Sequence, residues 1–303
     1  MNLSGMYHTQ GMLFLLMLLG LLLKKIRVIT EEGVRVLTDL VLYVTLPASI
    51  LKSFQMELTA ELLQSCMRVL LVTVLVLTVS FLVGKTAFFF LPLRERKIME
   101  YASMVSNAGI LGNPVAEGIF GSLGLMYASI YAIPLRIYMW SFGLMCFTKS
   151  ADGKNVWKKT CTHPCILAAV FGLILMLTRF RLPEVLSLAV TSVAGANTFL
   201  SMALVGTILA TIPIQSVMDK KALYYTAIRL VLLPAAALLL CRITGCDAVV
   251  TGVVVTLTGM PAGSTTAVLA EKYGCDAVLA TRCVMLSTIL SMATIPVWCL
   301  LIS

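Results

Sequence analysis

Apolar stretches of about 20 residues follow one another along nearly the whole chain. Each is long enough to cross the roughly 30 Å hydrocarbon core of a bilayer as a helix. The chain is 59% hydrophobic and 12% charged, about half the charged fraction of roughly 25% that is usual for a soluble domain. The sequence therefore predicts an all-α membrane protein with ten transmembrane helices. We expect these helices at residues 6–23, 36–55, 66–91, 98–120, 123–147, 162–178, 184–210, 222–241, 247–270 and 277–301.

The basic residues of the short loops gather on one side of the expected membrane. Placing the N-terminus outside makes the odd-numbered loops cytoplasmic, and the excess of positive charge in these loops predicts that both termini are outside. The net charge of +9 is then a signal of topology, and it requires no nucleic-acid partner, because no single basic face forms. The cytoplasmic set is Lys24, Lys25, Arg27, Arg35, Arg94, Arg96, Lys97, Lys149, Lys154, Lys158, Lys159, Lys220, Lys221 and Lys272, against Lys52, Arg68, Arg179, Arg181 and Arg242 outside.

Two of the apolar stretches, one in each half of the chain, are interrupted by glycines and a proline. The first reads SNAGILGNP over residues 106–114, and the second reads LTGMPAGS over residues 257–264. Their prolines are separated by close to half of the chain, and paired broken helices of this kind indicate the substrate site of a transporter. The residues that we expect at this site are Asn107, Gly109, Gly112, Asn113, Pro114, Thr258, Gly259, Pro261 and Ser264.

The breaks have a chemical consequence. Proline removes a backbone donor and blocks the carbonyl four residues before it, while glycine makes the chain easy to unwind. Unwound backbone at membrane depth persists only where it lines a polar cavity or is buried against protein, so we expect the two breaks to face each other. A helix that begins at Pro114 would offer its N-terminus to an anion, and a helix that ends near Gly109 would offer carbonyls to a cation. One such kink more often reflects packing alone, but a pair with polar neighbours favours a site.

A charged stretch, Lys149 to Lys159, is the longest polar connection in the chain. It divides the sequence into a first repeat at residues 1–148, a cytoplasmic connecting loop at 149–160 and a second repeat at 161–303. Five spans on each side mean that the second unit crosses the membrane in the opposite direction to the first. The sequence therefore predicts two inverted five-helix repeats.

Ionisable side chains inside the expected spans are costly if they face lipid, so they should face the protein interior or an aqueous cavity. Arg136 is the deepest, and a guanidinium matches a carboxylate bidentately, so Arg136 is our candidate for holding an anionic substrate. Glu117 is a candidate carrier of a coupling proton. The alternative is a structural ion pair between these two residues. We expect Arg229 and Arg282 to be structural or interfacial, because they lie nearer to the helix ends.

Other functional classes find little support. The sequence Cys161-Thr162-His163-Pro164-Cys165 has neither the CxxC spacing nor the second cluster of a metal site, so we expect no metal and no cofactor. An intramembrane enzyme would need a nucleophile with a base or a metal cluster, and no HExxH, GxSxG or paired Asp motif is present. We therefore expect a protein that is not an enzyme.

Three stretches of the sequence carry a family resemblance: Gly20 to Pro47, Asn107 to Gly121 (NAGILGNPVAEGIFG) and Pro261 to Pro296. The chain resembles the auxin efflux carrier family, which includes plant PIN-type exporters and bacterial malate or malonate permeases. By position, Asn107 and Asn113 match polar residues of the family's fourth-helix motif. The long cytoplasmic loop of many plant members is absent, and Arg136 has no matched family position.

The resemblance implies an architecture and a mechanism. It implies ten helices in two inverted repeats, with the fourth and ninth crossing at Pro114 and Pro261. Spans one, two, six and seven would form a scaffold, the other six a mobile transport domain, and access would alternate by an elevator movement. It also implies a homodimer through the scaffold and residence in the bacterial cytoplasmic (inner) membrane, with contacts to the lipid bilayer.

The substrate class implied is a small organic anion, such as malate, malonate or an auxin-like acid, moved by a secondary transporter with H⁺ or Na⁺ coupling. The runner-up is a sodium-coupled symporter of the related crossed-helix fold, such as one for bile acids. A channel is a third reading, against which the paired breaks argue. Which anion is carried, in which direction and with which ion stays open at this point.

Overall fold

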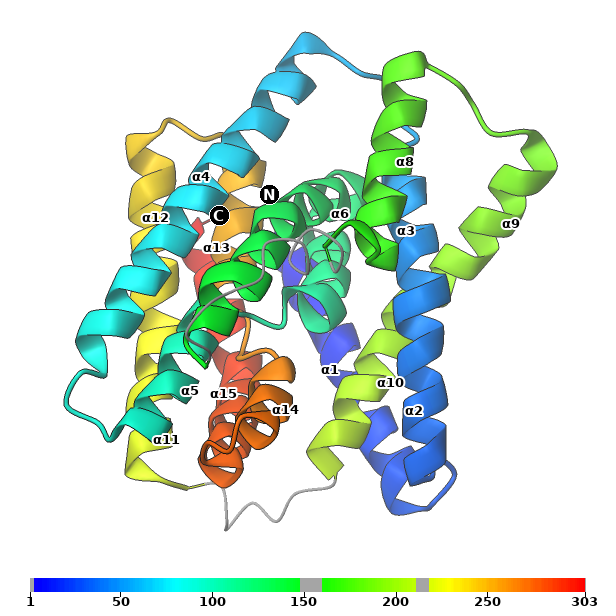
Figure 1. The fold of residues 1–303 in the computed structure, drawn as a ribbon. Coiled ribbons are helices and arrows are strands. Elements are labelled where there is room, and N and C mark those ends of the chain that lie inside the picture. Colours follow the sequence, from blue (N-terminus) through cyan, green and yellow to red (C-terminus); the bar gives the residue numbers. More distant parts are fainter. Residues whose placement is uncertain (1–2, 148–159, 211–217, 303) are drawn as a thin grey trace. The chain divides into compact units, whose positions relative to one another are not determined.

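The computed structural model describes residues 3–147, 160–210 and 218–302, and these residues form helices (Figure 1). Within the described residues, pairing of the β type is limited to one isolated bridge, between Ser106 and Ala262. The expected all-α class is thus confirmed. The charged connection at 149–159 lies outside the described residues. Helical segments long and apolar enough to cross a membrane are Glu31–Ser53, Ala60–Ala87, Ala108–Gly143, Glu184–Ala210, Lys220–Ile243 and Ala277–Ile302, six among the residues described.

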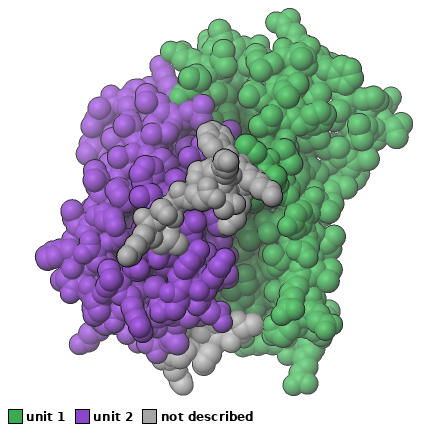
Figure 2. All heavy atoms as spheres, in the orientation of Figure 1, with its two compact units in different colours: residues 1–67, 109–130, 161–212 green, residues 68–108, 131–160, 213–303 purple. Residues whose placement is uncertain are grey.

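The chain divides into two compact units, which Figure 2 colours separately. Unit 1 comprises residues 1–67, 109–130 and 161–212. Its helices are α1 (Leu3–Lys25), α2 (Glu31–Leu40), the π-helical turn η1 (Val41–Thr45), α3 (Leu46–Ser53), α8 (Pro164–Thr178), α9 (Glu184–Gly195) and α10 (Asn197–Ala210).

Glycines set the closest helix packing in unit 1. Helix α10 runs along α1 (Figure 1). The two backbones meet at Gly20 and Gly206. A Cβ built on Gly20 would lie 2.2 Å from the carbonyl oxygen of Ala203, and one built on Gly206 would lie 2.0 Å from the carbonyl oxygen of Met17. In a membrane the hydrophobic effect does not drive helices together, because lipid tails are as apolar as the side chains. Helices pack there by close van der Waals contact, which small residues such as glycine allow.

Unit 2 comprises residues 68–108, 131–160 and 213–303. Its helices include α4 (Ala60–Ala87), most of which lies in this unit, α5 (Leu93–Met104), η3 (Met139–Gly143), α11 (Lys220–Ala227) and η5 (Ile228–Leu232). They continue with α12 (Leu233–Ile243), α13 (Ala248–Thr258), α14 (Thr265–Lys272) and α15 (Ala277–Ile302).

Two further elements, η2 (Ala108–Gly112) and α6 (Asn113–Tyr138), connect the residues of one unit to those of the other along the chain. Helix α6 changes direction at Gly121, whose φ of 67° and ψ of −159° are not helical. Only glycine adopts such a backbone conformation without strain. The kink falls where the sequence predicts the boundary between the fourth and fifth spans.

Three of the π-helical turns described share a sequence feature. η1 is followed by Pro47, η2 by Pro114 and η5 by Pro234, each at the second position of the next helix. A proline ring clashes with the carbonyl four residues before it, and the wider π turn moves that carbonyl aside. These helices therefore pass their prolines without breaking.

Candidate functional site

The two interrupted segments each contain a short stretch of non-helical backbone. Helix α5 ends at Met104, and Val105 has the extended angles φ −101° and ψ 102°. Helix α13 ends at Thr258, and α14 begins at Thr265 after a non-helical stretch at 259–264. Both stretches lie in unit 2 and are bounded by helices on either side.

These two stretches pair with each other by main-chain hydrogen bonds. Ser106 and Ala262 form an antiparallel bridge. The N–H of Asn107 donates to the carbonyl of Pro261 at 2.8 Å, and the N–H of Gly263 donates to the carbonyl of Val105 at 2.9 Å. The unwound backbone groups thus satisfy one another, which is the requirement for irregular backbone at membrane depth. We call this paired region, residues 105–107 and 261–263, the crossover. Its existence agrees with the expectation that the two breaks face each other.

The position of the first break differs from the prediction. The sequence placed it between Gly109 and Pro114, but α5 ends at Met104 and helical structure resumes at Ala108. Gly109 and Gly112 lie in η2, and Asn113 and Pro114 begin α6. Pro114 is therefore not the crossing point, because the preceding π turn accommodates its ring and the helix continues. In the second segment the crossing falls at Ala262, directly after Pro261, close to the predicted place.

Side chains close the helix ends at the crossover. Arg229, on η5, donates from Nε to the carbonyl of Met260 at 2.9 Å and from Nη1 to the carbonyl of Ser103 at 2.7 Å. Tyr225 donates its hydroxyl to the carbonyl of Ala102 at 2.9 Å, and the N–H of Ala262 donates to Oγ of Ser287 at 3.1 Å. Three carbonyls at or just beyond the ends of α5 and α13, those of Ala102, Ser103 and Met260, are thus bound within unit 2.

Tyr225 is a residue at the crossover that the sequence analysis did not single out. Arg229 was expected to be structural or interfacial, and its 2% exposure and main-chain partners agree with the structural alternative. The sequence contains a signal for this burial, namely an arginine five residues before Pro234 in an otherwise apolar run. In the structure Arg229 lies in the π turn η5, which precedes that proline, and its side chain is buried. Arg282, by contrast, is partly exposed and lies 3.7 Å from a carboxylate oxygen of Asp219.

The other expected site residues of unit 2 lie around the second break. Thr258 is buried at the end of α13, where its hydroxyl donates to the carbonyl of Val254 at 2.7 Å and lies 3.4 Å from the hydroxyl of Tyr131. Gly259 follows as the C-cap of α13. Ser264 is exposed and is the N-cap residue of α14, to which its side chain gives no capping bond. Arg136, half-buried on α6, has Nη1 3.9 Å from the sulfur of Met139.

In unit 1, the first turns of α6 carry two oxygen atoms without partners. The side-chain oxygen Oδ1 of Asn113 and the carboxylate oxygen Oε2 of Glu117 are buried and have no hydrogen-bond partner among the described residues. They lie four residues apart on one helix, so they share a face. Glu117 belongs to unit 1 and Arg136 to unit 2, and the ion pair between them stays a prediction.

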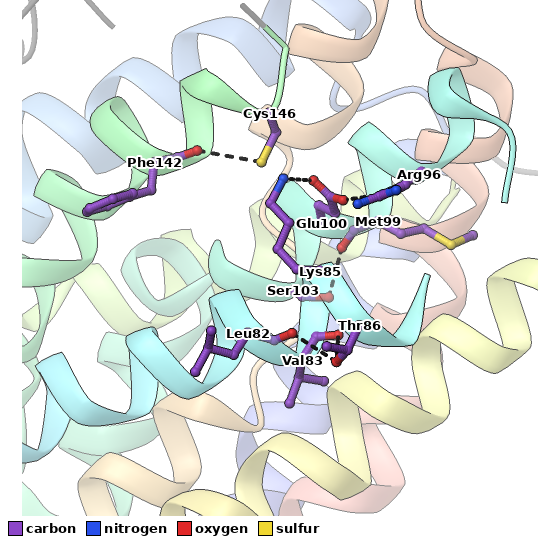
Figure 3. A network of polar contacts seen from close by, with 10 residues as sticks. All are labelled: Leu82, Val83, Lys85, Thr86, Arg96, Met99, Glu100, Ser103, Phe142 and Cys146. Atoms are coloured by element: carbon purple, nitrogen blue, oxygen red, sulfur yellow. Dashed lines mark hydrogen bonds and ion pairs between the residues drawn. The ribbon is translucent and has the colours of Figure 1, made fainter. Parts of the chain in front are cut away.

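A buried carboxylate on α5 gathers two cations (Figure 3). Glu100 is 4% exposed and receives ion pairs from Lys85 of α4 and from Arg96, one turn before it on α5. In Figure 3 the carboxylate lies between the two basic side chains. A buried acid is tolerated when it is paired in this way. The network fixes α4 against α5 three residues before Ser103, whose carbonyl Arg229 binds.

A cavity of about 860 Å³ lies in unit 1, at the ends of α3, α8 and α9. Its lining includes Phe54, Glu57, Arg179, Arg181, Glu184 and Leu188. The side chains of Arg181 and Glu57 form an ion pair at 3.2 Å across the two loops that border it, and both are largely exposed. None of the residues of the interrupted segments takes part in this lining.

The known proteins that this chain resembles are membrane transporters. A family model described as "Membrane transport protein" matches residues 9–156 and again residues 152–299, once in each half. An uncharacterized transporter of Methanothermobacter thermautotrophicus is 28% identical over 311 residues, with 97% of each chain covered. An uncharacterized transporter of Methanocaldococcus jannaschii is 24% identical over 301 residues, with 94% of each chain covered.

Proposed function

The chain belongs to the membrane transport protein family, that of the auxin efflux carriers, and on this basis we propose that it is a secondary transporter of small organic anions. Membership of this family makes the protein a membrane transporter. Our proposal adds the substrate, the mechanism and the coupling ion. Candidate substrates are carboxylates such as malate, malonate and auxin-like acids.

The crossover is the single observation that supports the proposal most. Two non-helical stretches from distant parts of the sequence meet there as an antiparallel bridge between Ser106 and Ala262. Pairs of discontinuous helices hold the substrate near the bilayer midplane in many secondary transporters. In our proposal the substrate binds beside Asn107, Thr258, Gly259, Pro261 and Ser264, with Arg136 as a further contact of its carboxylate.

The sequence also assigns Gly109 and Gly112 of η2 and Asn113 and Pro114 of α6 to the substrate site, and we keep that assignment as part of the proposal. The unpartnered oxygens of Asn113 and Glu117 support a role as hydrogen-bond acceptors, and for Glu117 we propose in addition that its carboxylate takes up the coupling proton. In the other protonation state Glu117 would pair with a cation of the protein.

The proposed architecture is ten membrane crossings in two inverted repeats, with both termini outside. The double match of the family model, once in each half, supports the repeats. The spans that the family resemblance assigns to a scaffold, α1, α2 with α3, α8 and α9 with α10, all fall in unit 1, and a dimer would form through them. Their grouping supports an elevator movement in part, since unit 1 also contains residues 109–130 of the expected fourth and fifth spans.

The test is uptake and efflux of labelled malate, malonate and indole-acetate by purified protein in liposomes. We expect flux of at least one of these acids, and a large reduction in Asn113→Ala and Arg136→Ala. Arg181→Ala, on the exposed ion pair with Glu57, is the matched control and should transport as wild type does. Normal flux in both site variants would contradict the site, whereas wild-type protein that moves none of the acids would contradict the substrate class. Flux that requires a sodium gradient would favour the bile-acid-like symporter instead.

A further inference from the structure

Arg229 joins the two broken segments of unit 2 through their carbonyl ends. Its Nε binds the carbonyl of Met260, and its Nη1 binds the carbonyl of Ser103. Ser103 is the second-last residue of α5, and Met260 follows the C-cap of α13 by one residue. The same guanidinium therefore lies at two helix C-termini, and it is 2% exposed.

Among the residues that the structure describes, the charge of this guanidinium has no acidic partner. Among the described residues, no ion pair includes Arg229, and its hydrogen bonds go to the two main-chain carbonyls. An α-helix carries about half a negative charge at its C-terminus, so two C-termini together present about one. The buried positive charge is thus balanced by the ends of α5 and α13, and a carboxylate is not needed.

A cation bound by carbonyls at the ends of broken helices has a known counterpart in transport proteins. Unwound carbonyls and half-helix C-termini are the ligands that hold a coupling Na⁺ in carriers with discontinuous helices. Sodium is a hard cation that prefers such oxygens, and a carbonyl already bound by a charge-assisted N–H is a poor ligand for it. The guanidinium and the ion would compete for the same place.

We propose that Arg229 is a tethered cation that occupies, in this crossover, the position of a coupling Na⁺. The inference deepens the proposed function and rests on it in one respect, namely that the crossover is the place where an ion would be coupled. The consequence is that substrate movement does not depend on Na⁺ at this site. The positive charge at the two helix ends belongs to the protein chain itself, so it stays in place when unit 2 moves.

The test uses the full chain, purified in detergent, and needs no substrate. Melting temperatures are measured in NaCl and in choline chloride at equal ionic strength for wild type, Arg229→Ser, Arg229→Lys and Arg282→Gln. Wild type should melt at the same temperature in both salts. Arg229→Ser should melt about 5 °C lower in choline chloride, because two carbonyls lose a charged partner. Na⁺ should recover part of that loss with a saturable dose dependence, because it binds the folded form.

The remaining variants separate a tethered cation from a merely structural cap. Arg229→Lys keeps the charge and should remain indifferent to Na⁺, and so should Arg282→Gln, in which the change lies away from the crossover. A loss of stability in Arg229→Ser that Na⁺ does not reduce would overturn the proposal. A Na⁺-specific rise in the melting temperature of wild type would overturn it equally, and this arm remains decisive if Arg229→Ser does not fold. Failure of wild type to carry any organic anion would contradict the proposed function alone, since these readouts do not involve a substrate.

Discussion

Trp298 of α15 donates its indole N–H to the carbonyl oxygen of Leu230 at 2.7 Å. Leu230 lies four residues before Pro234, so its carbonyl is the one that the missing proline N–H leaves open in the helix. A side chain from a different helix thus supplies the donor that the sequence of η5 and α12 lacks. Both groups are buried, and an unbound carbonyl there would cost free energy.

This pairing predicts a coupling between two substitutions. Trp298→Phe should destabilise the protein by about 1–3 kcal/mol, because the carbonyl of Leu230 is left without a partner. In a Pro234→Ala background the alanine N–H can take that carbonyl, so the same substitution should cost less. Thermal unfolding of the four proteins forms a double-mutant cycle. Equal costs of Trp298→Phe in both backgrounds would show that the hydrogen bond is not what stabilises this junction.

The contact between α1 and α10 predicts a sharp difference between two glycines of one helix. Gly20→Ala places a methyl group against the backbone of Ala203 and should cost about 1–3 kcal/mol or more. Gly11→Ala is the matched control, because a Cβ there meets no atom within 4 Å. Its effect on the melting temperature should be small, and comparable losses in the two variants would contradict the close approach.

The buried carboxylate of Glu100 predicts a large effect of a small change. Glu100→Gln removes the negative charge and leaves Lys85 and Arg96 beside each other without it, which should cost about 3–5 kcal/mol. Glu57→Gln breaks the largely exposed pair with Arg181 and should cost less than about 1 kcal/mol. Chemical or thermal unfolding measures both, and an indifferent Glu100→Gln would mean that the network adds nothing to stability.

The change of direction in α6 predicts intolerance at Gly121. With φ of 67° and ψ of −159°, alanine at this position should cost about 1–3 kcal/mol. Gly195→Ala lies in ordinary backbone with free space around its Cβ and serves as the control. If Gly121→Ala unfolds at the temperature of wild type, the helix tolerates a straight path through this residue.

The rate at which Cys275 is labelled should depend on pH. Burial raises the pKa of the Cys275 thiol, which lies in the turn between α14 and α15. A raised pKa lowers the thiolate fraction near neutrality, and the thiolate is the reactive form. In a variant that keeps only Cys275, labelling by a maleimide should be slow at pH 7 and rise about tenfold for each pH unit. A variant that keeps only the exposed Cys161 should label faster at pH 7, and the reverse order would contradict the assignment.

The helical class and its suitability for a bilayer could be read from the sequence, because length and apolarity decide whether a helix suits a bilayer. The count of ten spans stays a prediction, since six long apolar segments are found among the described residues. The second break was also located well, since Gly259 and Pro261 lie in the non-helical stretch itself. The first break was predicted too close to Pro114. A proline in the sequence shows that the carbonyl four residues before it will be strained, but it does not show how the helix relieves that strain. A π turn relieves it in η2, and the break falls at Val105 instead, where no proline or glycine marks it.

Arg229 shows a second limit of the sequence argument. Its partners are main-chain carbonyls of Ser103 and Met260, which are distant in sequence and carry no side-chain signature. Its distance from the helix end left a structural and an interfacial role both open, because long basic side chains near the ends of membrane helices often reach toward water. Only the folded arrangement of α5, η5 and α13 shows that the side chain turns inward.

The crossover residues take part in its hydrogen bonds through their own main-chain groups, and this has a consequence for how the sequence can diverge. The donors at Asn107, Ala262 and Gly263 are backbone N–H groups, which nearly every residue type provides. Relatives could therefore replace these side chains to suit other solutes while the path of the chain stays the same. Proline is the exception, since it would delete a donor at any of the three positions. The main chain of these residues thus stabilises the crossover, while their side chains are free to vary with the solute.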